Sequence, residues 1–334
     1  MNDWRSVLHN DPINWLLEPE NPSVRYLALT QLLDMPESDA EVASARSSIM
    51  QRGTVPEMLA LQATEAYQKT FPRFYTAKYT GLVWSLIVLA EHRASLNAQI
   101  AAQCEYLLTN AQESTEGGFA MNTSAKTGGG RITEVIPCLT GNMVWCMVTL
   151  GYGDDPRVAK GVDWLVNHMR YNDGIALDPQ TPPYDRYEMC WGAHTCHMGV
   201  VKALKAYSVI PQPQRTPEVQ AAIVKAAEFM LAHHVDRRSH NLNRISKPGW
   251  RRLGFPLMYQ TDTLEVLDVL TALGYRDPRM ADAVQAMVDK QDADGRWRLE
   301  NTYANDRILL PMGSKGEPNK WLTLRALRVL KRYL

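Results

Sequence analysis

The stretch Leu150-Gly-Tyr-Gly-Asp-Asp-Pro-Arg157 recurs later in the chain as Leu273-Gly-Tyr-Arg-Asp-Pro-Arg279. In both places an apolar helical segment precedes the stretch and a second helical segment follows it, so the stretch is the turn of a repeated helical hairpin. One such hairpin cannot bury its apolar face alone, and repeated hairpins therefore stack on one another. The sequence predicts a mostly helical repeat protein.

Hairpins can be aligned along most of the chain. Their predicted first helices are Tyr79 to Glu91, Cys138 to Leu150, Cys190 to Tyr207, Tyr259 to Leu273 and Lys320 to Leu334. The predicted second helices are Asn97 to Asn110, Pro156 to Arg170, Thr216 to His234 and Pro278 to Gln291. Each second helix has Pro, Asn or Thr near its start, and apolar residues recur in it three and four positions apart. Upstream, three more helices are expected at Asp11 to Leu17, Val24 to Leu33 and Ser38 to Gln51.

Gly-centred turns follow several of the second helices. The clearest is Gln291-Asp-Ala-Asp-Gly-Arg-Trp297, and weaker forms are Gln112 to Phe119 and Asn172 to Ile175. Gln-x-x-x-Gly-x-Trp after a helix resembles the QW motif of the terpenoid cyclase and protein prenyltransferase superfamily. The resemblance covers the repeat pattern from about Lys78 to the C-terminus. It implies an α/α toroid, in which outer helices surround inner helices and a central cavity.

The alternative is an open superhelix of the HEAT type, which would offer a concave groove to another protein. HEAT repeats have short turns, whereas four linkers here are long and rich in Gly, Pro and polar residues: 113–137, 171–189, 236–257 and 298–319. Loops of this length in a compact domain are commonly functional. We therefore expect one all-α toroid over residues 1–334, with helices of 1–77 closing the ring formed by 78–334.

Composition narrows the possible partners and location. The 334 residues are 45% apolar and carry 36 acidic and 36 basic side chains, so no general attraction to nucleic acid is expected. The longest apolar run, Gly81 to Ala90, is about half of what a membrane span needs, and the N-terminus lacks the plan of a signal peptide. We expect a cytoplasmic protein whose five cysteines are free thiols. The sequence leaves a protein partner open.

Potential catalytic or metal-binding side chains concentrate in Glu188-Met-Cys-Trp-Gly-Ala-His-Thr-Cys-His-Met198. On one continuous helix, Cys190, His194 and His197 would share a face, because they are four and three residues apart. By repeat alignment, Cys138 and Asp262 begin the neighbouring first helices. We therefore predict His194, Asp262, Cys190 and His197 as catalytic residues, and Cys138, Cys190, His194 and Asp262 as possible zinc ligands.

The resemblance gives zinc some support. Protein prenyltransferases hold zinc with Asp, Cys and His at inner-helix ends, and lanthipeptide cyclases use an adjacent Cys-His pair that Cys196-His197 is similar to. The chain departs from both, since it has no Asp-x-Cys and Cys190-Trp191-Gly192 reverses the Trp-Cys-x-Gly order. It also lacks the Asp-x-Asp-Asp acid of class II terpene cyclases. A metal-free polar cluster and simple burial of these residues remain alternatives.

Other residues are predicted to line a substrate pocket. They lie at or near the starts of the first helices: Tyr79, Cys138, Asn142, Tyr184, Tyr187, Trp191 and Tyr259. Arg251 belongs to a basic loop that could clamp a phosphate or carboxylate, with an ordinary solvated loop as the alternative.

Three functions follow. The first is an enzyme that transforms a largely apolar small molecule by acid/base chemistry, with His194 or Asp262 tuned by burial. The second is a zinc enzyme that activates a thiol or water. The third is a binding or scaffold protein without catalysis.

Overall fold

The computed structural model describes residues 3–175, 181–238 and 241–334, and these are mostly helical, as predicted. Two short antiparallel strands, β1 (Arg237–Arg238) and β2 (Asn241–Ile245), form a hairpin that the sequence did not reveal. Within the described ranges, every helix is too short or too polar to cross a membrane.

The predicted hairpins are present. Their first helices are α6 (Leu82–Glu91), α8 (Pro137–Met147), α11 (His197–Ser208), α13 (Thr263–Ala272) and α15 (Lys320–Tyr333). Their second helices are α7 (Ala98–Asn110), α9 (Pro156–His168), α12 (Pro217–Ala232) and α14 (Ala281–Val288), the last preceded by a 3₁₀ turn at Pro278–Met280. Asn97, Asp155 and Thr216 cap three of the second helices by accepting a backbone N–H, which is why the start signals located them well.

The N-terminal part is also helical. It contains a 3₁₀ turn at Trp4–Val7, then α1 (Ile13–Leu16), α2 (Pro22–Gln31), α3 (Ala40–Ser48), α4 (Thr54–Gln62), α5 (Glu65–Gln68) and a 3₁₀ turn at Phe71–Arg73. The sequence analysis missed α4 and α5. Pro56 lies within the first turn of α4, where proline is tolerated because those N–H groups have no partner inside the helix.

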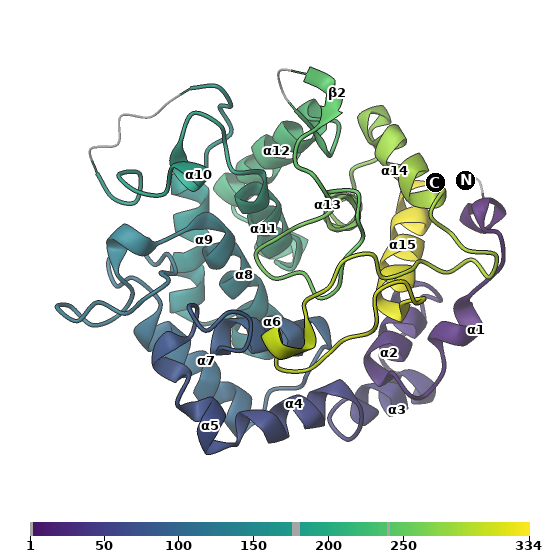
Figure 1. The fold of residues 1–334 in the computed structure, drawn as a ribbon, viewed down its shortest axis with the longest axis horizontal. Coiled ribbons are helices and arrows are strands. Elements are labelled where there is room, and N and C mark those ends of the chain that lie inside the picture. The colour runs from purple at the N-terminus through teal and green to yellow at the C-terminus, as the bar shows by residue number, and fades with distance from the viewer. Residues whose placement is uncertain (1–2, 176–180, 239–240) are drawn as a thin grey trace.

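The first helices of the hairpins lie inside the others (Figure 1). α6 packs against α8, α8 against α11, α11 against α13, α13 against α15, and α15 against α2. The series also returns to its start, because Arg325 of α15 forms an ion pair with Glu91 of α6 at 2.9 Å. The inner helices supply much of the two large core clusters, and buried ion pairs also join them, such as the pair of Lys202 on α11 with Glu265 on α13.

The repeated Asp-Pro-Arg turns lock successive second helices together. Arg157, which follows the cap of α9, donates to both carboxylate oxygens of Glu105 on α7 at 2.9 Å each. Arg279 makes the same contact with Glu228 on α12, at 2.7 and 2.9 Å. The stretch that repeats in the sequence is therefore a repeated structural contact.

The Gln side chains of two QW-like turns, Gln112 and Gln291, reach a neighbouring segment of the chain. The Gln112 side-chain amide donates to the carbonyl of Arg157 at the start of α9. Gln291, in the last such turn, donates instead to the carbonyl of Val7 and accepts the N–H of His9. The N-terminal segment thus stands where a following hairpin would stand.

One predicted helix is wrong. Cys190 to Tyr207 was expected to be continuous, but α10 (Glu188–Trp191) ends at Gly192 and α11 begins at His197. Gly192 has an extended backbone, with ψ −165°. The buried guanidinium of Arg170 donates hydrogen bonds to the carbonyls of Trp191 and Gly192, at 2.7 and 2.6 Å. Those carbonyls are unavailable to a continuing helix, so Cys190, His194 and His197 do not share one helix face.

Candidate functional site

A pocket of about 550 Å³ lies where the loop after α9, the break before α11 and the β1–β2 hairpin meet. Two of the long linkers therefore do contribute to one site. The lining mixes charged, polar and apolar groups, and its residues are Asp173, Glu188, Met189, Gly192, Ala193, His194, Thr195, Cys196, His197, Arg238, Ser246 and Lys247.

Asp173 and His197 line this pocket, and the buried His233 meets them behind its surface. One potential ligand atom from each residue lies within 4.8 Å of the other two, which makes them a group that could hold a metal ion. Nε2 of His233 is 3.2 Å from Oδ2 of Asp173, and the rings of His197 and His233 are 4.4 Å apart. Two imidazoles and a carboxylate are a donor set that zinc and other divalent transition metals use.

Backbone contacts hold Asp173 in place. Its Oδ1 accepts the N–H of Thr195 at 3.0 Å and lies 3.0 Å from Nδ1 of His194, whose ring is largely exposed. The N–H of Gly174 donates to the carbonyl of Ala193 at 2.8 Å. The Asn172-Asp173-Gly174 turn is thereby fixed against the break between α10 and α11.

The two buried histidines are oriented in the manner of metal ligands. Nδ1 of His233 is 2.6 Å from the carbonyl of Phe229, one turn back in α12, which fixes the ring so that Nε2 faces Asp173. Nδ1 of His197 lies 3.4 Å from the hydroxyl of Ser246. Burial lowers the pKa of His197 to about 3, and the neighbouring His233 adds to the shift. His197 is therefore neutral, as ligation requires.

The cysteines are not part of this group of possible metal ligands, although Cys196 lines the pocket. Burial raises the pKa of Cys138 to about 12. A hydrogen bond from Cys190 lowers the pKa of Cys196 to about 6. The thiols of Cys190 and Cys196 are thus hydrogen-bonded to each other, and all five cysteines of the chain are free thiols.

The four predicted zinc ligands are not brought together. In the part of the chain that the structure describes, the one group of His, Cys, Asp and Glu with suitable spacing is Asp173, His197 and His233. Asp262 is fully occupied as the N-cap of α13: its carboxylate accepts the N–H groups of Gly254 and Glu265, at 2.8 Å each. Burial raises its pKa to about 6, but Asp262 does not line the pocket.

The predicted aromatic wall contains a lysine. The ammonium of Lys78 lies 4.6 Å from the ring centre of Tyr75, 4.7 Å from that of Tyr259 and 5.8 Å from that of Trp84. Tyr79 packs on Tyr303, with ring centres 4.3 Å apart. Tyr259 therefore contacts a cationic side chain of the protein itself, and Tyr79 packs against other aromatic rings.

The remaining predicted substrate residues make internal contacts. Tyr184 and Trp191 pack edge to face, with ring centres 5.0 Å apart, and Trp191 is buried. Asn142 donates to the carbonyl of Met258, and Arg251 pairs with Asp236 at 2.6 Å. Tyr187 is half-buried and precedes α10 with a left-handed backbone.

Neither protein-family models nor curated protein sequences give a match to this chain. The site therefore has to be interpreted from its own geometry. Sequence reasoning found His194 and His197 but missed Asp173 and His233 as partners. Asp173 was interpreted as a turn residue and His233 as a helix end, and both interpretations are structurally correct, yet the two side chains meet across the pocket wall.

Proposed function

We propose that this protein is a metal-dependent enzyme, with zinc as the first candidate, whose site is formed by Asp173, His197 and His233. The observation that carries the proposal is the convergence of these three ligand atoms within 4.8 Å, with Asp173 and His197 lining an accessible pocket. Three protein ligands leave a position for water or substrate, which is typical of catalytic rather than structural zinc. A bound zinc ion would supply an acidified water or polarise a carbonyl or phosphoryl oxygen.

We further propose that the helices form the α/α toroid that the QW-like turns predict. The packing series from α6 through α8, α11, α13 and α15, with the return contact between Arg325 and Glu91, supports a closed ring. The contact of Gln291 with the N-terminal segment supports closure at the periphery. A likeness to the terpenoid cyclase and prenyltransferase superfamily would then rest on architecture, while the site uses different residues.

The remaining pocket residues have roles that follow from their chemistry. Glu188 offers a carboxylate that could accept a proton from a nucleophile, and the exposed His194 could exchange one with solvent. Arg238 and Lys247 place positive charge on the same wall. With Asp173 and Glu188 on the same lining, the charges of the two signs balance, so the pocket suits a substrate that has both polar and apolar parts.

Metal analysis of the tag-free protein tests the proposal. Wild type should carry about one zinc ion per chain, and Asp173→Asn and His233→Gln should lose it while keeping the helical circular dichroism spectrum. Cys190→Ala is the matched control, because this residue belonged to the other predicted ligand set and should leave the zinc content unchanged.

Zinc retained in Asp173→Asn but lost in Cys190→Ala would reject this site and restore the cysteine-based one. Protein without metal, even after zinc is added and excess removed, would reject metal dependence. The Asp173 and His233 pair would then be a metal-free acid/base candidate, or the chain a binding protein.

A further inference from the structure

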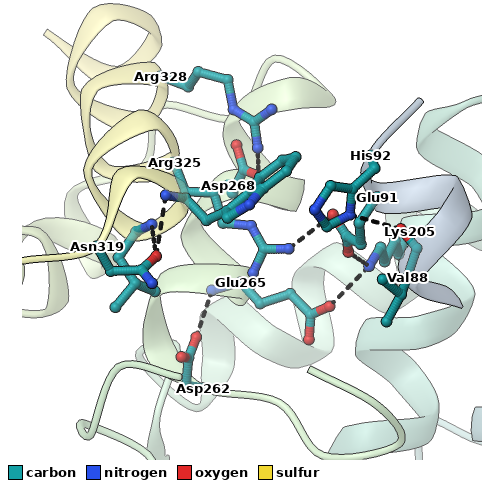
Figure 2. A network of polar contacts seen from close by, with 12 residues as sticks. Val88, Glu91, His92, Lys205, Asp262, Glu265, Asp268, Asn319, Arg325 and Arg328 are labelled. Carbon is teal, nitrogen blue, oxygen red and sulfur yellow. Dashed lines mark hydrogen bonds and ion pairs between the residues drawn. The ribbon is translucent and has the colours of Figure 1, made fainter. Parts of the chain in front are cut away.

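A second cavity, of about 280 Å³, lies among the inner helices toward the opposite end of α11. Its wall includes Glu91, the last residue of α6, and Lys205, two turns beyond the His197 that faces the first pocket. Its charged lining consists of three carboxylates, Glu91, Glu265 and Asp268, and five cations, Arg93, Lys205, Arg325, Arg328 and Arg332. Figure 2 shows much of this network.

The three carboxylates are already neutralised. Glu265 accepts from Lys202 with both oxygens, at 2.7 and 2.8 Å, although Lys202 is outside the cavity wall. Glu91 pairs with Lys205 at 2.6 Å and with Arg325 at 2.9 Å. Asp268 pairs with Arg328 and, at 3.0 Å, with Arg332. Counted over the lining residues alone, five cations face three carboxylates, so the lining carries two more positive than negative charges.

Arg325 is one cation of this lining that has an N–H group without a hydrogen-bond acceptor in the described structure. The residue is only 3% exposed, and its Nη1 has no hydrogen-bond partner in the described structure. Arg325 lies in the second turn of α15, too far from the C-terminal end for the helix dipole to compensate its charge. A buried guanidinium N–H without an acceptor is costly, so a missing acceptor is the simplest explanation.

Arg93 adds to the excess. It lines the same cavity, forms no ion pair with any carboxylate that the structure describes, and burial lowers its pKa. Two uncharged polar residues, Gln31 and Ser208, also line the cavity. Gln31 accepts a hydrogen bond from Arg328 at 2.9 Å.

We propose that this cavity binds a small oxyanion with two negative charges, of which a phosphate group is the closest chemical match. Guanidinium groups bind phosphate through paired N–H donors, and two charges balance the excess of the lining. A cavity of 280 Å³ holds a phosphate together with a small organic part. The site is separate from the proposed metal site and does not depend on it.

Titration with inorganic phosphate tests this site, at constant ionic strength maintained with chloride, by calorimetry and thermal unfolding. Wild type should show saturable binding at one site and a matching rise in Tm. Arg325→Met should abolish the saturable component. Arg279→Gln is the matched control, because it removes an arginine from a comparable ion pair with Glu228 but far from the cavity, and it should bind phosphate like wild type.

Gln31→Glu guards against a loss of binding caused by misfolding. The new carboxylate would have nearly the size of Gln31 and would lie beside Arg328, so it should stabilise the free protein while weakening phosphate binding by about tenfold. Glycerol phosphate, used as a second probe, distinguishes two kinds of ligand. Tighter binding than inorganic phosphate would indicate that the cavity binds a phosphorylated metabolite, and equal binding would indicate that it binds free phosphate. Absence of saturable binding to wild type, or equal affinity in Gln31→Glu, would overturn the proposal.

Discussion

The guanidinium of Arg170 is buried beneath the candidate metal site and donates to the backbone carbonyls of Ile175, Trp191 and Gly192. These carbonyls flank Asp173 on one side and His194 on the other. Arg170 therefore ties together two loop segments that carry site residues, without touching the site itself. Side chains of this kind fix the geometry of metal ligands, and their loss reduces metal affinity.

Replacing Arg170 with Lys should weaken zinc binding by about 10- to 100-fold, because one ammonium cannot reach all three carbonyls. Competition with a chromogenic chelator measures the affinity, and circular dichroism verifies the fold. Arg157→Lys removes a forked contact with Glu105 elsewhere on the surface and serves as the control. Unchanged zinc affinity in Arg170→Lys would show that the two segments are held in place by other contacts.

His92 predicts a specific loss of stability in acid. It is buried, its Nδ1 lies 2.8 Å from the carbonyl of Val88, and its ring packs on Trp321. Burial lowers its pKa from 6.5 to about 4, against an opposing effect of Glu91 and a reinforcing one of Arg325. The unfolded chain therefore binds a proton more readily than the folded one below pH 6.5, and stability falls as the pH decreases toward 4.

Through this group the free energy of unfolding should be about 2 kcal/mol lower at pH 5 than at pH 7. Urea unfolding of wild type and His92→Gln at both pH values isolates the effect, since other titrating groups contribute equally to both. The variant should lose about 2 kcal/mol less than wild type between the two pH values. His9 is exposed, so His9→Gln should lose as much stability as wild type between pH 7 and pH 5. If His92→Gln also lost as much as wild type, the assignment of this pH dependence to His92 would be wrong.

At the level of secondary structure, the sequence predicted most hairpin helices to within a few residues. The reason is local: apolar periodicity defines a helix, and side chains such as Asn97 and Thr216 mark its start by capping it. The break at 192–196 escaped prediction because its cause, Arg170, is more than twenty residues away in the sequence. The β1–β2 hairpin is too short to give a periodic signal.

The candidate site was less predictable than the helices. Spacing along one helix can suggest which residues share a face, but Asp173, His197 and His233 come from three different segments. The loop and helix ends that bring them together are positioned by tertiary contacts. For Asp262 the position predicted from the sequence, immediately before an inner helix, is right, but the sequence did not reveal the role of its carboxylate. In the structure that carboxylate caps α13.

Asp262→Ala should therefore affect stability and not the site. It removes the cap of α13 and leaves the buried N–H of Gly254 without an acceptor, for a combined cost of about 2–4 kcal/mol. Urea unfolding measures the cost, and zinc content should remain as in wild type. Asp39→Ala, which removes the exposed cap of α3, should cost only about 1 kcal/mol. Loss of zinc from folded Asp262→Ala would return Asp262 to the list of ligands.

On the scale of the whole molecule, the N-terminal segment and the last QW-like turn form a seam. Besides the hydrogen bonds of Gln291 with Val7 and His9, Lys320 pairs with Glu18 at 2.7 Å. The guanidinium of Arg296 lies over the ring of Trp15, 4.5 Å from its centre. These contacts join the start and the end of the chain where a continuous repeat array would have its next hairpin.

Gln291→Ala should open this seam selectively. Losing the two hydrogen bonds should cost about 1–3 kcal/mol and should accelerate hydrogen exchange at the backbone N–H of His9, which loses its acceptor. Gln112→Ala makes the equivalent change between hairpins inside the chain, and should leave exchange at His9 unchanged. Equal acceleration in both variants would mean that the seam is no different from the other hairpin contacts.

The seam also has a consequence for the protein during its synthesis. α2 packs on α15, so Val24 and Leu27, which are buried in the folded chain, lack part of their cover until the other end of the chain leaves the ribosome. At about 5–20 residues per second, that interval lasts for many seconds. Although α2 is translated long before α15, it is thus sheltered only after α15 has emerged, and during that interval a nascent-chain chaperone could bind its exposed apolar surface.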